Sequence, residues 1–245
     1  MQKAIRIIAA VLVVGFLGYV IVQASISNEK AQKEAWDIAM TLGDREKAEY
    51  VFYDYTDIMC PYCNKFALAM DAHLDEFKKD YVEDQKVYYE LRLTDLLSYY
   101  HPESEETVSN SHNSARAGYC AAKENKFWEY YGWLLNKLSA DYYVYDIGTA
   151  PGKESIPKLE TTYFTEVGDD IEGLSSETMA DCIGSDEIIA KVNKYTNRAR
   201  NIVKSGLPYY VFGGYTAPGF DGNWDIEHDW KQARLLFDAG IASKK

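Results

Sequence analysis

The stretch YTDIMCPYCNKFALAM (residues 55–70) contains two cysteines, Cys60 and Cys63, that flank a Pro-Tyr pair. A run rich in aromatic residues precedes the pair, and an apolar, helix-prone run follows it at once. Cysteines at this spacing occur in three kinds of site: half of a zinc site, a small structural disulfide, or a redox pair that forms and breaks disulfides. Which of these applies decides what the protein does.

The residues around the pair predict a strand-helix-strand unit. EYVFYDYT (49–56) is dominated by aromatic residues and favours a buried strand. After the cysteines, apolar residues recur at helical spacing, at Phe66, Met70, Leu74 and Phe77. KVYYELRL (86–93) is the next predicted strand. The cysteines therefore lie at the strand-to-helix junction of a βαβ unit.

The rest of the chain predicts a helical block followed by a hairpin and a last helix. Residues from about 95 to 205 read as helices, with a surface loop at 141–168 and Gly184 and Gly206 at helix ends. Two short strands within 207–220 are joined by a Gly-Gly pair, and an amphipathic helix covers 224–241. The order predicts one α/β domain with a helical insertion.

The N-terminus predicts export. Two cationic residues precede an uncharged apolar run, residues 7–22, and with its neighbours (residues 4–24) it reaches the ~20 residues that a membrane span needs. The segment 1–25 is an uncleaved anchor or a signal peptide cut near Ala24, and the length of the run favours the anchor. Residues 26–47 then form a helical spacer, and the folded domain is residues 48–245. Cations before the run predict that all that follows is extracytoplasmic, where disulfides persist.

Composition limits the classes of partner. The chain has 245 residues and a formal net charge of −12, with acidic residues spread along its length. An acidic surface repels phosphate backbones, so nucleic acid is not an expected partner.

A zinc site and a purely structural disulfide explain the cysteine pair poorly. Structural zinc needs four ligands, usually in two close pairs, but Cys120 and Cys182 are singletons, and the four histidines show no ligand spacing. A disulfide between Cys60 and Cys63 would close so small a loop that it would restrain the unfolded chain little. We therefore predict no metal.

The redox interpretation explains more of the sequence. At the start of a helix that runs on from Pro61, backbone N–H groups and the helix dipole stabilise a Cys60 thiolate. Cys63, one turn on and facing inward, keeps a higher pKa and resolves mixed disulfides. A stabilised thiolate makes the disulfide form the better oxidant.

Four segments, in this order, resemble the DsbA-like thiol:disulfide oxidoreductases: YVFYDYTDIMCPYCNKF, ARAGYCAAKENKFWEYYGWLL, DCIGSDEIIAKVNKYTNRARNIVKSGLPYYVFGG and PGFDG. The resemblance covers roughly residues 48–242 and implies a thioredoxin fold with a helical insertion. It implies Cys60 as the nucleophile, Cys63 as the resolving cysteine and Pro208 as a cis-proline beside them. Asp54 matches the buried strand carboxylate that assists proton transfer in this family, which often has the longer Glu there.

The resemblance also implies roles for the neighbouring residues. Asp57 matches an acidic residue common before the motif in exported relatives, although a turn or capping role explains it equally well. The substrate-binding groove would be apolar and lined by Pro61, Tyr62, Leu207 and Tyr209. Tyr62 replaces the His of the best-studied oxidase, and Leu207 replaces the Thr common in isomerases.

Cys120 and Cys182 both fall in the helical block, at positions that recur in related exported proteins. The resemblance implies that they pair as a structural disulfide. The alternative is two buried free thiols that act as small hydrophobic residues.

The function that these features favour is an exported oxidase that introduces disulfides into secreted proteins, with no cofactor beyond its own cysteine pair. Its expected partners are unfolded or reduced exported proteins and a quinone-linked membrane reoxidant of the DsbB or vitamin K epoxide reductase type. Two alternatives remain: a reductase or isomerase on the same fold, and a non-catalytic binder of unfolded exported chains.

Overall fold

The computed structural model describes residues 39–142, 156–167, 170–212, 215–218 (backbone only) and 225–242. The predicted anchor or signal segment, 1–25, lies outside the described residues, as does the spacer up to residue 38. No helix within the described ranges is both long and apolar enough to span a membrane.

One mixed sheet of five strands forms the centre of the domain, in the order β1-β3-β2-β4-β5. Its strands are β1 (Thr41–Leu42), β2 (Tyr50–Thr56), β3 (Val87–Leu93), β4 (Tyr209–Phe212) and β5 (Tyr215–Pro218). β2 and β3 are parallel, as a βαβ unit requires, and the other neighbouring pairs are antiparallel. The predicted strand-helix-strand unit and the later hairpin are therefore both present.

The predicted helical spacer is wrong where the structure describes its end. Thr41 and Leu42 form an edge strand, β1, antiparallel to β3, and the amide of Leu91 donates to the carbonyl of Met40. Met40 is buried at 2% exposure, so burial and sheet pairing outweigh the helix propensity of this stretch. The folded domain thus includes residues before 48.

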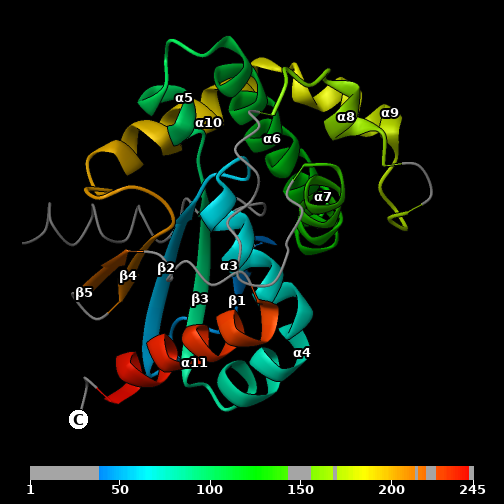
Figure 1. Ribbon diagram of the computed structural model, residues 1–245. Helices are drawn as coiled ribbons and strands as arrows, with labels where there is room; N and C mark the ends of the chain where they lie inside the picture. The colour runs from blue at the N-terminus through cyan, green and yellow to red at the C-terminus, as the bar shows by residue number, and fades with distance from the viewer. Residues whose placement is uncertain (1–38, 143–155, 168–169, 213–214, 219–224, 243–245) are drawn as a thin grey trace, which may run out of the picture. The chain divides into compact units, whose positions relative to one another are not determined.

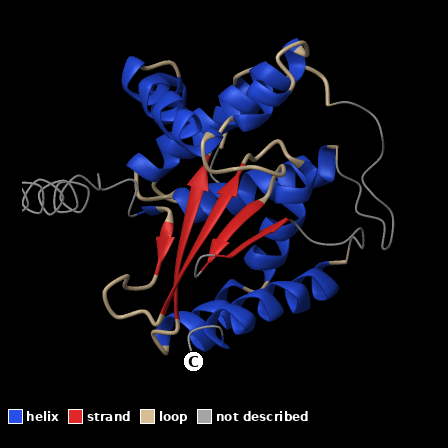
Figure 2. Ribbon diagram, turned by 90° about the vertical axis from the view of Figure 1, so that its left-hand side faces the viewer, coloured by secondary structure: helices blue, strands red, loops and turns tan. Residues whose placement is uncertain are grey.

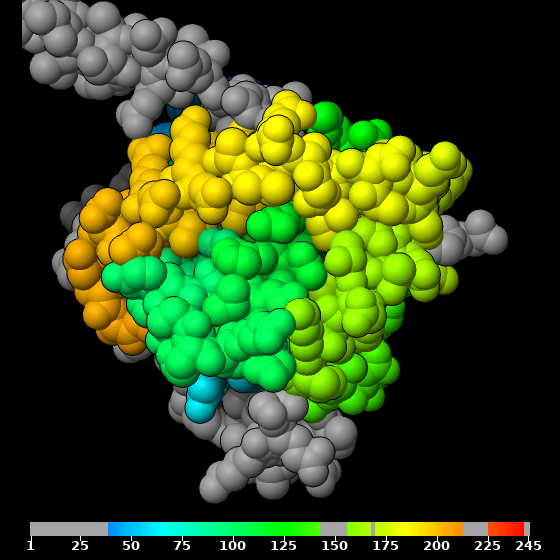
Figure 3. All heavy atoms as spheres, turned by 90° about the horizontal axis from the view of Figure 1, so that it is seen from above, coloured from blue at the N-terminus to red at the C-terminus, as the bar shows by residue number. Residues whose placement is uncertain are grey.

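Two groups of helices surround the sheet (Figures 1 and 2). Against one face lie α3 (Pro61–Ala72), α4 (Leu74–Phe77), the π-helical turn η1 (Lys78–Glu83) and α11 (Ile226–Ala242). Beyond the carboxyl ends of β2 and β3 lie α5 (Leu96–Tyr100), α6 (Glu105–Lys123), α7 (Phe127–Asp141), α8 (Thr162–Thr165), α9 (Ser176–Ile183) and α10 (Asp186–Arg200). The second group is the predicted helical insertion, and in Figure 3 its segments, green through yellow to orange, form most of the surface seen from above.

The apolar stripe after the cysteines forms more than one helical segment. α3 ends at Ala72, and α4 begins after His73. The ring of His73 stacks on Trp230 of α11 at 5.1 Å between centroids, and its Nδ1 lies 3.3 Å from Glu76. The break therefore occurs where this segment is held against the last helix.

Aromatic side chains fill the core between the sheet and this helical layer. Phe52 on β2 is fully buried and contacts four other rings, those of Tyr89, Tyr210, Phe212 and Phe237, at 5.0–5.8 Å between centroids. Strand alternation places Asp54 and Thr56 on the same face of β2 as Phe52. Two polar side chains therefore lie on the buried face, toward the end of the strand that leads to the cysteines.

Serine side chains begin three helices of the insertion. Ser104, Ser175 and Ser185 each accept a hydrogen bond from a backbone N–H in the first turn, of α6, α9 and α10 respectively. Gly184 ends α9 as predicted, whereas α10 ends at Arg200, well before Gly206. Gly206 instead has φ of +100°, a conformation that glycine adopts readily, in the turn before β4.

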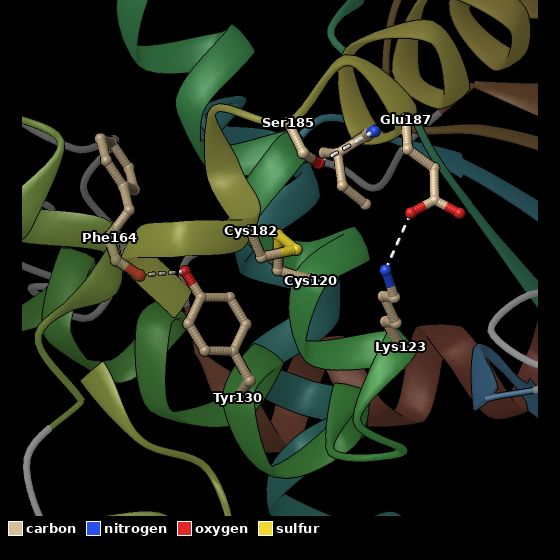
Figure 4. The surroundings of a disulfide bond; sticks show 8 residues. Cys120, Lys123, Tyr130, Phe164, Cys182, Ser185 and Glu187 are labelled. Carbon is tan, nitrogen blue, oxygen red and sulfur yellow. Dashed lines mark hydrogen bonds and ion pairs between the residues drawn. A yellow bond between two sulfur atoms is a disulfide. The ribbon is translucent and has the colours of Figure 1, made fainter. Parts of the chain in front are cut away.

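A disulfide joins two helices of the insertion, as the resemblance implies. Cys120 of α6 and Cys182 of α9 are bonded across a sequence separation of 62, with 5.8 Å between their Cα atoms. Figure 4 shows the bond between the two helices, with the ion pair of Lys123 and Glu187 beside it. The insertion is thus cross-linked close to the point where α10 begins.

Candidate active site

The cysteine pair lies at the start of α3. Cys60 occupies the N-cap position in an extended conformation, and Pro61 is the first helical residue, where a missing N–H costs no helical hydrogen bond. The two thiols are not joined, and Cys60 and Cys63 are 4% and 1% exposed. Cys63 lies one helical turn deeper, which matches the predicted difference between an outer and an inner cysteine.

The segment before β4 meets this turn. The Leu207–Pro208 peptide bond is cis, and the thiol of Cys60 donates to the carbonyl of Leu207 at 3.7 Å. β4 pairs with β2 through Tyr55 and Tyr209, so the strand that precedes the cysteines also fixes the position of Pro208. The structure therefore brings together Cys60, Leu207 and Pro208, which lie nearly 150 positions apart in sequence.

Cys63 has an environment that opposes ionisation. Burial raises the pKa of its thiol well above the usual range, and the neighbouring sulfur of Cys60 raises it further. Hydrogen bonds from the Thr56 hydroxyl and from the Asp57 backbone act in the opposite direction but do not compensate. Cys63 therefore needs a proton acceptor before it can act as a nucleophile.

Asp54 is a buried acid on the face of β2 that also carries Phe52 and Thr56. Its side chain is 2% exposed, and the Tyr89 hydroxyl donates to Oδ2 at 2.6 Å. Burial raises the pKa of Asp54 to about 7, and the hydrogen bond from Tyr89 limits the rise. A carboxyl group that titrates near neutral pH can both give and take a proton under physiological conditions.

Asp57 connects the cysteine turn to the helical insertion. Its carboxylate accepts the Met59 amide at 3.0 Å, the Leu97 amide at 3.0 Å and the Ser111 hydroxyl at 2.6 Å. Its backbone carbonyl accepts the Cys60 amide at 3.0 Å. Burial raises the pKa of Asp57 to about 6 despite these bonds. The carboxylate therefore stabilises the turn before α3 and also binds α5 and α6, but it does not cap α3, whose N-cap residue is Cys60.

A second acidic group beside Asp57 was not predicted. Asp95 follows β3, and its carboxylate binds His112 Nδ1 at 2.5 Å and the hydroxyl of Thr196. Burial raises the pKa of Asp95, but these two hydrogen bonds outweigh burial, and the pKa is lowered overall. Because β2 and β3 are parallel, the acids after them meet at one edge, and adjacent residues of α6 contact both. The sequence did contain a signal for this pair: an Asp follows closely after each of the two predicted parallel strands.

The predicted substrate-binding residues differ in exposure. Tyr62 is 46% exposed, and Pro61 and Leu207 are half-buried, so all three present surface near Cys60. Tyr209 does not: it is 5% exposed and packs with Tyr55 in a buried cluster against α10. Its position on the inner face of β4 makes it a core residue rather than a groove residue.

No group of three or more His, Cys, Asp and Glu side chains suited to a metal ion occurs in the described part of the chain.

Comparison with known proteins places this geometry in a family. A family model described as thioredoxin matches residues 37–208, which is most of the chain. The chain belongs to the thioredoxin family. The match begins at residue 37 and so includes β1, in agreement with the structure. No curated protein sequence matches this thioredoxin-family chain.

Solved structures with the same fold include DsbA-type proteins. DsbA1 of the alpha type from Wolbachia pipientis superposes with a TM-score of 0.56 at 14% identity, over 83% of this chain and 91% of that one. Oxidised BdbD from Bacillus subtilis gives 0.53 at 12% identity, over 83% and 92%. MdbA, a thiol-disulfide oxidoreductase from Corynebacterium matruchotii, gives 0.50 at 18% identity, over 73% and 81%. The resemblance to DsbA-like oxidoreductases is confirmed at the level of the fold.

Proposed function

We propose that the protein is a DsbA-like thiol:disulfide oxidoreductase that oxidises the thiols of exported proteins through Cys60 and Cys63. One observation supports this most directly. The Cys60 sulfur lies at the first turn of α3 against the Leu207 carbonyl, beside the cis Leu207–Pro208 bond, while Cys63 lies buried one turn deeper. A zinc ligand pair or a structural disulfide would need none of this arrangement.

In the proposed reaction, the oxidised pair accepts two electrons. A substrate thiolate attacks Cys60 Sγ, the Cys60–Cys63 bond breaks, and Cys63 leaves as a thiolate that takes a proton. A second substrate thiolate then attacks the substrate sulfur of the mixed disulfide, so that Cys60 leaves as a thiolate. The substrate gains a disulfide, and the enzyme is left reduced.

Asp54 is the proposed proton donor to Cys63 in this direction and its proton acceptor during reoxidation. A leaving thiolate whose pKa is raised well above the usual range is a poor leaving group unless it is protonated. Asp54, with a pKa of about 7, carries a proton in a large share of molecules at neutral pH. Its burial on the strand that leads to the cysteines supports this role.

The proposed partners and location follow from the sequence features and the family. The substrates are reduced exported proteins, which Tyr62, Pro61 and Leu207 would contact through apolar surface. A quinone-linked membrane protein of the DsbB or vitamin K epoxide reductase type would restore the disulfide. Residues 4–24 would hold the enzyme at the membrane, and no cofactor beyond the cysteine pair is proposed.

The test is the reduction potential of the Cys60–Cys63 pair, measured by equilibration with glutathione, together with oxidative refolding of a reduced substrate. An oxidase has a potential well above that of thioredoxin, about −270 mV, and speeds refolding in its oxidised form. A potential near that of thioredoxin would reject the oxidase and favour a reductase. A Cys60→Ala variant with full biological activity would favour a non-catalytic binder.

A further inference from the structure

The position of the Cys60 sulfur depends on the turn that precedes α3. Cys60 is the N-cap residue of this helix, and its thiol lies 3.7 Å from the Leu207 carbonyl. The N–H groups of a helix stabilise a thiolate only when it lies at the first turn, so a displacement of Cys60 would lower its reactivity. The residues that fix the turn therefore act on the thiol without touching it.

Asp57 begins this turn and holds it at two points. Its backbone carbonyl accepts the Cys60 amide at 3.0 Å, and its Oδ1 accepts the Met59 amide at 3.0 Å. The side chain thus bonds the backbone two residues on, which is the arrangement of an Asx turn. Because one residue makes both bonds, the Asp57 carboxylate and the Cys60 amide belong to the same turn.

The other carboxylate oxygen of Asp57 is held by the helical insertion. Oδ2 accepts the Leu97 amide of α5 at 3.0 Å and the Ser111 hydroxyl of α6 at 2.6 Å. The side chains of Asp57 and Ser111 are both 0% exposed, so water does not replace a bond that is lost here. The insertion and the cysteine turn are therefore joined at a single buried carboxylate.

The arrangement around Asp57 suits the ionised acid. Each oxygen faces a backbone N–H group, and such a group donates but cannot accept. A proton on Oδ1 would face the Met59 amide, and a proton on Oδ2 would displace the Leu97 amide or reverse the bond with Ser111. Burial raises the pKa of Asp57 to about 6, so the acid takes up a proton in mildly acidic solution. Uptake of that proton breaks at least one bond that holds the turn.

The neighbouring ionisable groups do not remove this dependence. Asp95, just after β3, is a second acid near Asp57, and its negative charge raises the pKa of Asp57 less than burial does. Its own carboxylate is bound by His112 of α6 and by the Thr196 hydroxyl of α10. From α3, the groups that follow the turn are the two thiols. The ionised form of Asp57 therefore depends on its own donors.

We propose that Asp57 is a positioning residue for the reaction of Cys60, which holds the turn in its reactive form while ionised and releases it when protonated. This inference rests on the proposed function. Protonation breaks the bond with the Met59 or the Leu97 amide, and the turn then departs from the geometry that places the thiol at the helix N-terminus. Asp57 touches no reacting atom and acts through the backbone of the turn.

Alkylation of Cys60 measures this dependence. Reduced full-length protein reacts with iodoacetamide at several pH values between 5 and 8, is quenched with acid, and is analysed by peptide mass spectrometry for the label on Cys60. The amide of Asp57→Asn can accept from only one of the two backbone donors. Its rate at pH 8 is expected to be about tenfold below that of the wild type. Between pH 8 and pH 5 the wild-type rate is expected to fall about tenfold more than the rate of the variant, since only the wild type loses the ionised acid.

Ser111→Ala tests the same acid from the other side. It removes a donor to the ionised form, so the acid-side fall in rate is expected to move to higher pH by up to about one pH unit. Ser114→Ala is the matched control, because that buried hydroxyl of α6 donates to the Ser111 carbonyl at 3.1 Å. Its pH profile should coincide with that of the wild type. A merely structural role for Ser111 would lower stability without moving the profile.

The possible outcomes separate the alternatives. Equal falls in the wild type and Asp57→Asn overturn the proposal, as does an unmoved profile in Ser111→Ala. A smaller fall in the wild type than in Asp57→Asn also overturns it, because Asp57 would then act as a charge that opposes the Cys60 thiolate. If Asp57→Asn does not fold, the profile of Ser111→Ala decides alone. Absence of label on wild-type Cys60 at every pH would instead contradict the proposed function.

Discussion

The two cysteine pairs differ in their spacing, in whether they are bonded and in their surroundings. Cys60 and Cys63 lie at the start of α3 and are not bonded, and the Cys60 amide donates to the backbone carbonyl of the buried acid Asp57. Cys120 and Cys182 lie on different helices, 62 positions apart, and are bonded. The first pair can restrain little because it closes a very short loop, whereas the second closes a long one. Sequence separation and surroundings therefore suit the first pair to the proposed reaction and the second pair to stabilising the fold.

The two pairs are nevertheless connected through α6. Cys120 joins this helix to α9, and Ser111, more than two turns earlier on it, donates to Asp57 beside the active cysteines. The disulfide thus fixes the helix that holds the cysteine turn. The insertion therefore supports the cysteine turn through Asp57, without touching the thiols in the bonds found here.

The largest expected effect comes from Cys60→Ser. It removes the proposed nucleophile, so thiol–disulfide exchange with a reduced substrate is expected to fall at least about 1,000-fold. The melting temperature of the reduced protein should change by less than about 2 °C, because Ser is a close isostere at a position that forms no disulfide here. Exchange assays and thermal melts check both parts. A large fall in melting temperature would mean that this pair too is structural.

The double variant Cys120→Ser/Cys182→Ser is expected to lose stability but to keep its exchange activity. In the chain-entropy model, a cross-link of this loop length stabilises by roughly 4 kcal/mol, about 10 °C in melting temperature for a domain of this size. Exchange activity at 25 °C should remain within about threefold of the wild type. Equal melting temperatures for the wild type and this double variant would show that the bond contributes nothing to stability.

Asp54→Asn is expected to flatten the pH dependence of stability. Burial raises the pKa of Asp54 from 3.8 to about 7, so the folded protein keeps a proton that the unfolded chain releases. The stability that this gives is present at low pH and is lost as the pH rises through about 7. Asn carries no charge, and its amide oxygen can still accept the Tyr89 hydroxyl.

Denaturant titrations of the wild type and Asp54→Asn at pH 5 and pH 8 measure this pH dependence of stability. The fall in the free energy of unfolding between the two values should be smaller in the variant by about 2–3 kcal/mol. Asp57, with a pKa of about 6, contributes a further fall in both proteins, which cancels in the comparison. Parallel pH profiles would show that Asp54 does not titrate in this range.

Ser111→Ala has the smallest expected effect. It removes one hydrogen bond to the Asp57 carboxylate, worth about 1.5–2 kcal/mol at pH 8. The loss should be smaller at pH 5, where Asp57 is protonated, because the bond to a charged acceptor is the stronger one. Ser114→Ala is the control, since that buried hydroxyl donates only to the Ser111 carbonyl in the bonds found here. Equal losses at both pH values would contradict a charged Asp57.

The sequence was sufficient for the helices and strands next to the cysteines. The strand before the cysteines, the helix after them and the strand at 87–93 follow local periodicity, and each forms within a residue or two of its predicted start. β1 was missed because a strand of two residues is too short to show an alternating pattern of apolar and polar residues. Only pairing with β3 makes these residues a strand. The start of α6 at Ser104 had a readable signal, a serine followed by two glutamates.

The environment of the site could not be predicted, because it is made of long-range contacts. Leu97 and Ser111 reach the turn before the cysteines from the insertion, and no local pattern marks them. Tyr209 and Tyr210 are adjacent, so one faces each side of β4, but the sequence does not say that both sides are covered. The end of α10 covers the side of Tyr209, and the aromatic core around Phe52 covers the side of Tyr210, so both are buried.

One ion pair joins the reactive turn to the last described helix. Lys65, two residues after Cys63, is 1% exposed in its side chain and binds Asp229 of α11 at 2.9 Å. The Asp229 side chain is 3% exposed, so both charges lie in the interior, where removing one member of a pair is strongly unfavourable. α11 therefore helps to hold α3, and anything that loosens this helix would also move the turn that carries the cysteines.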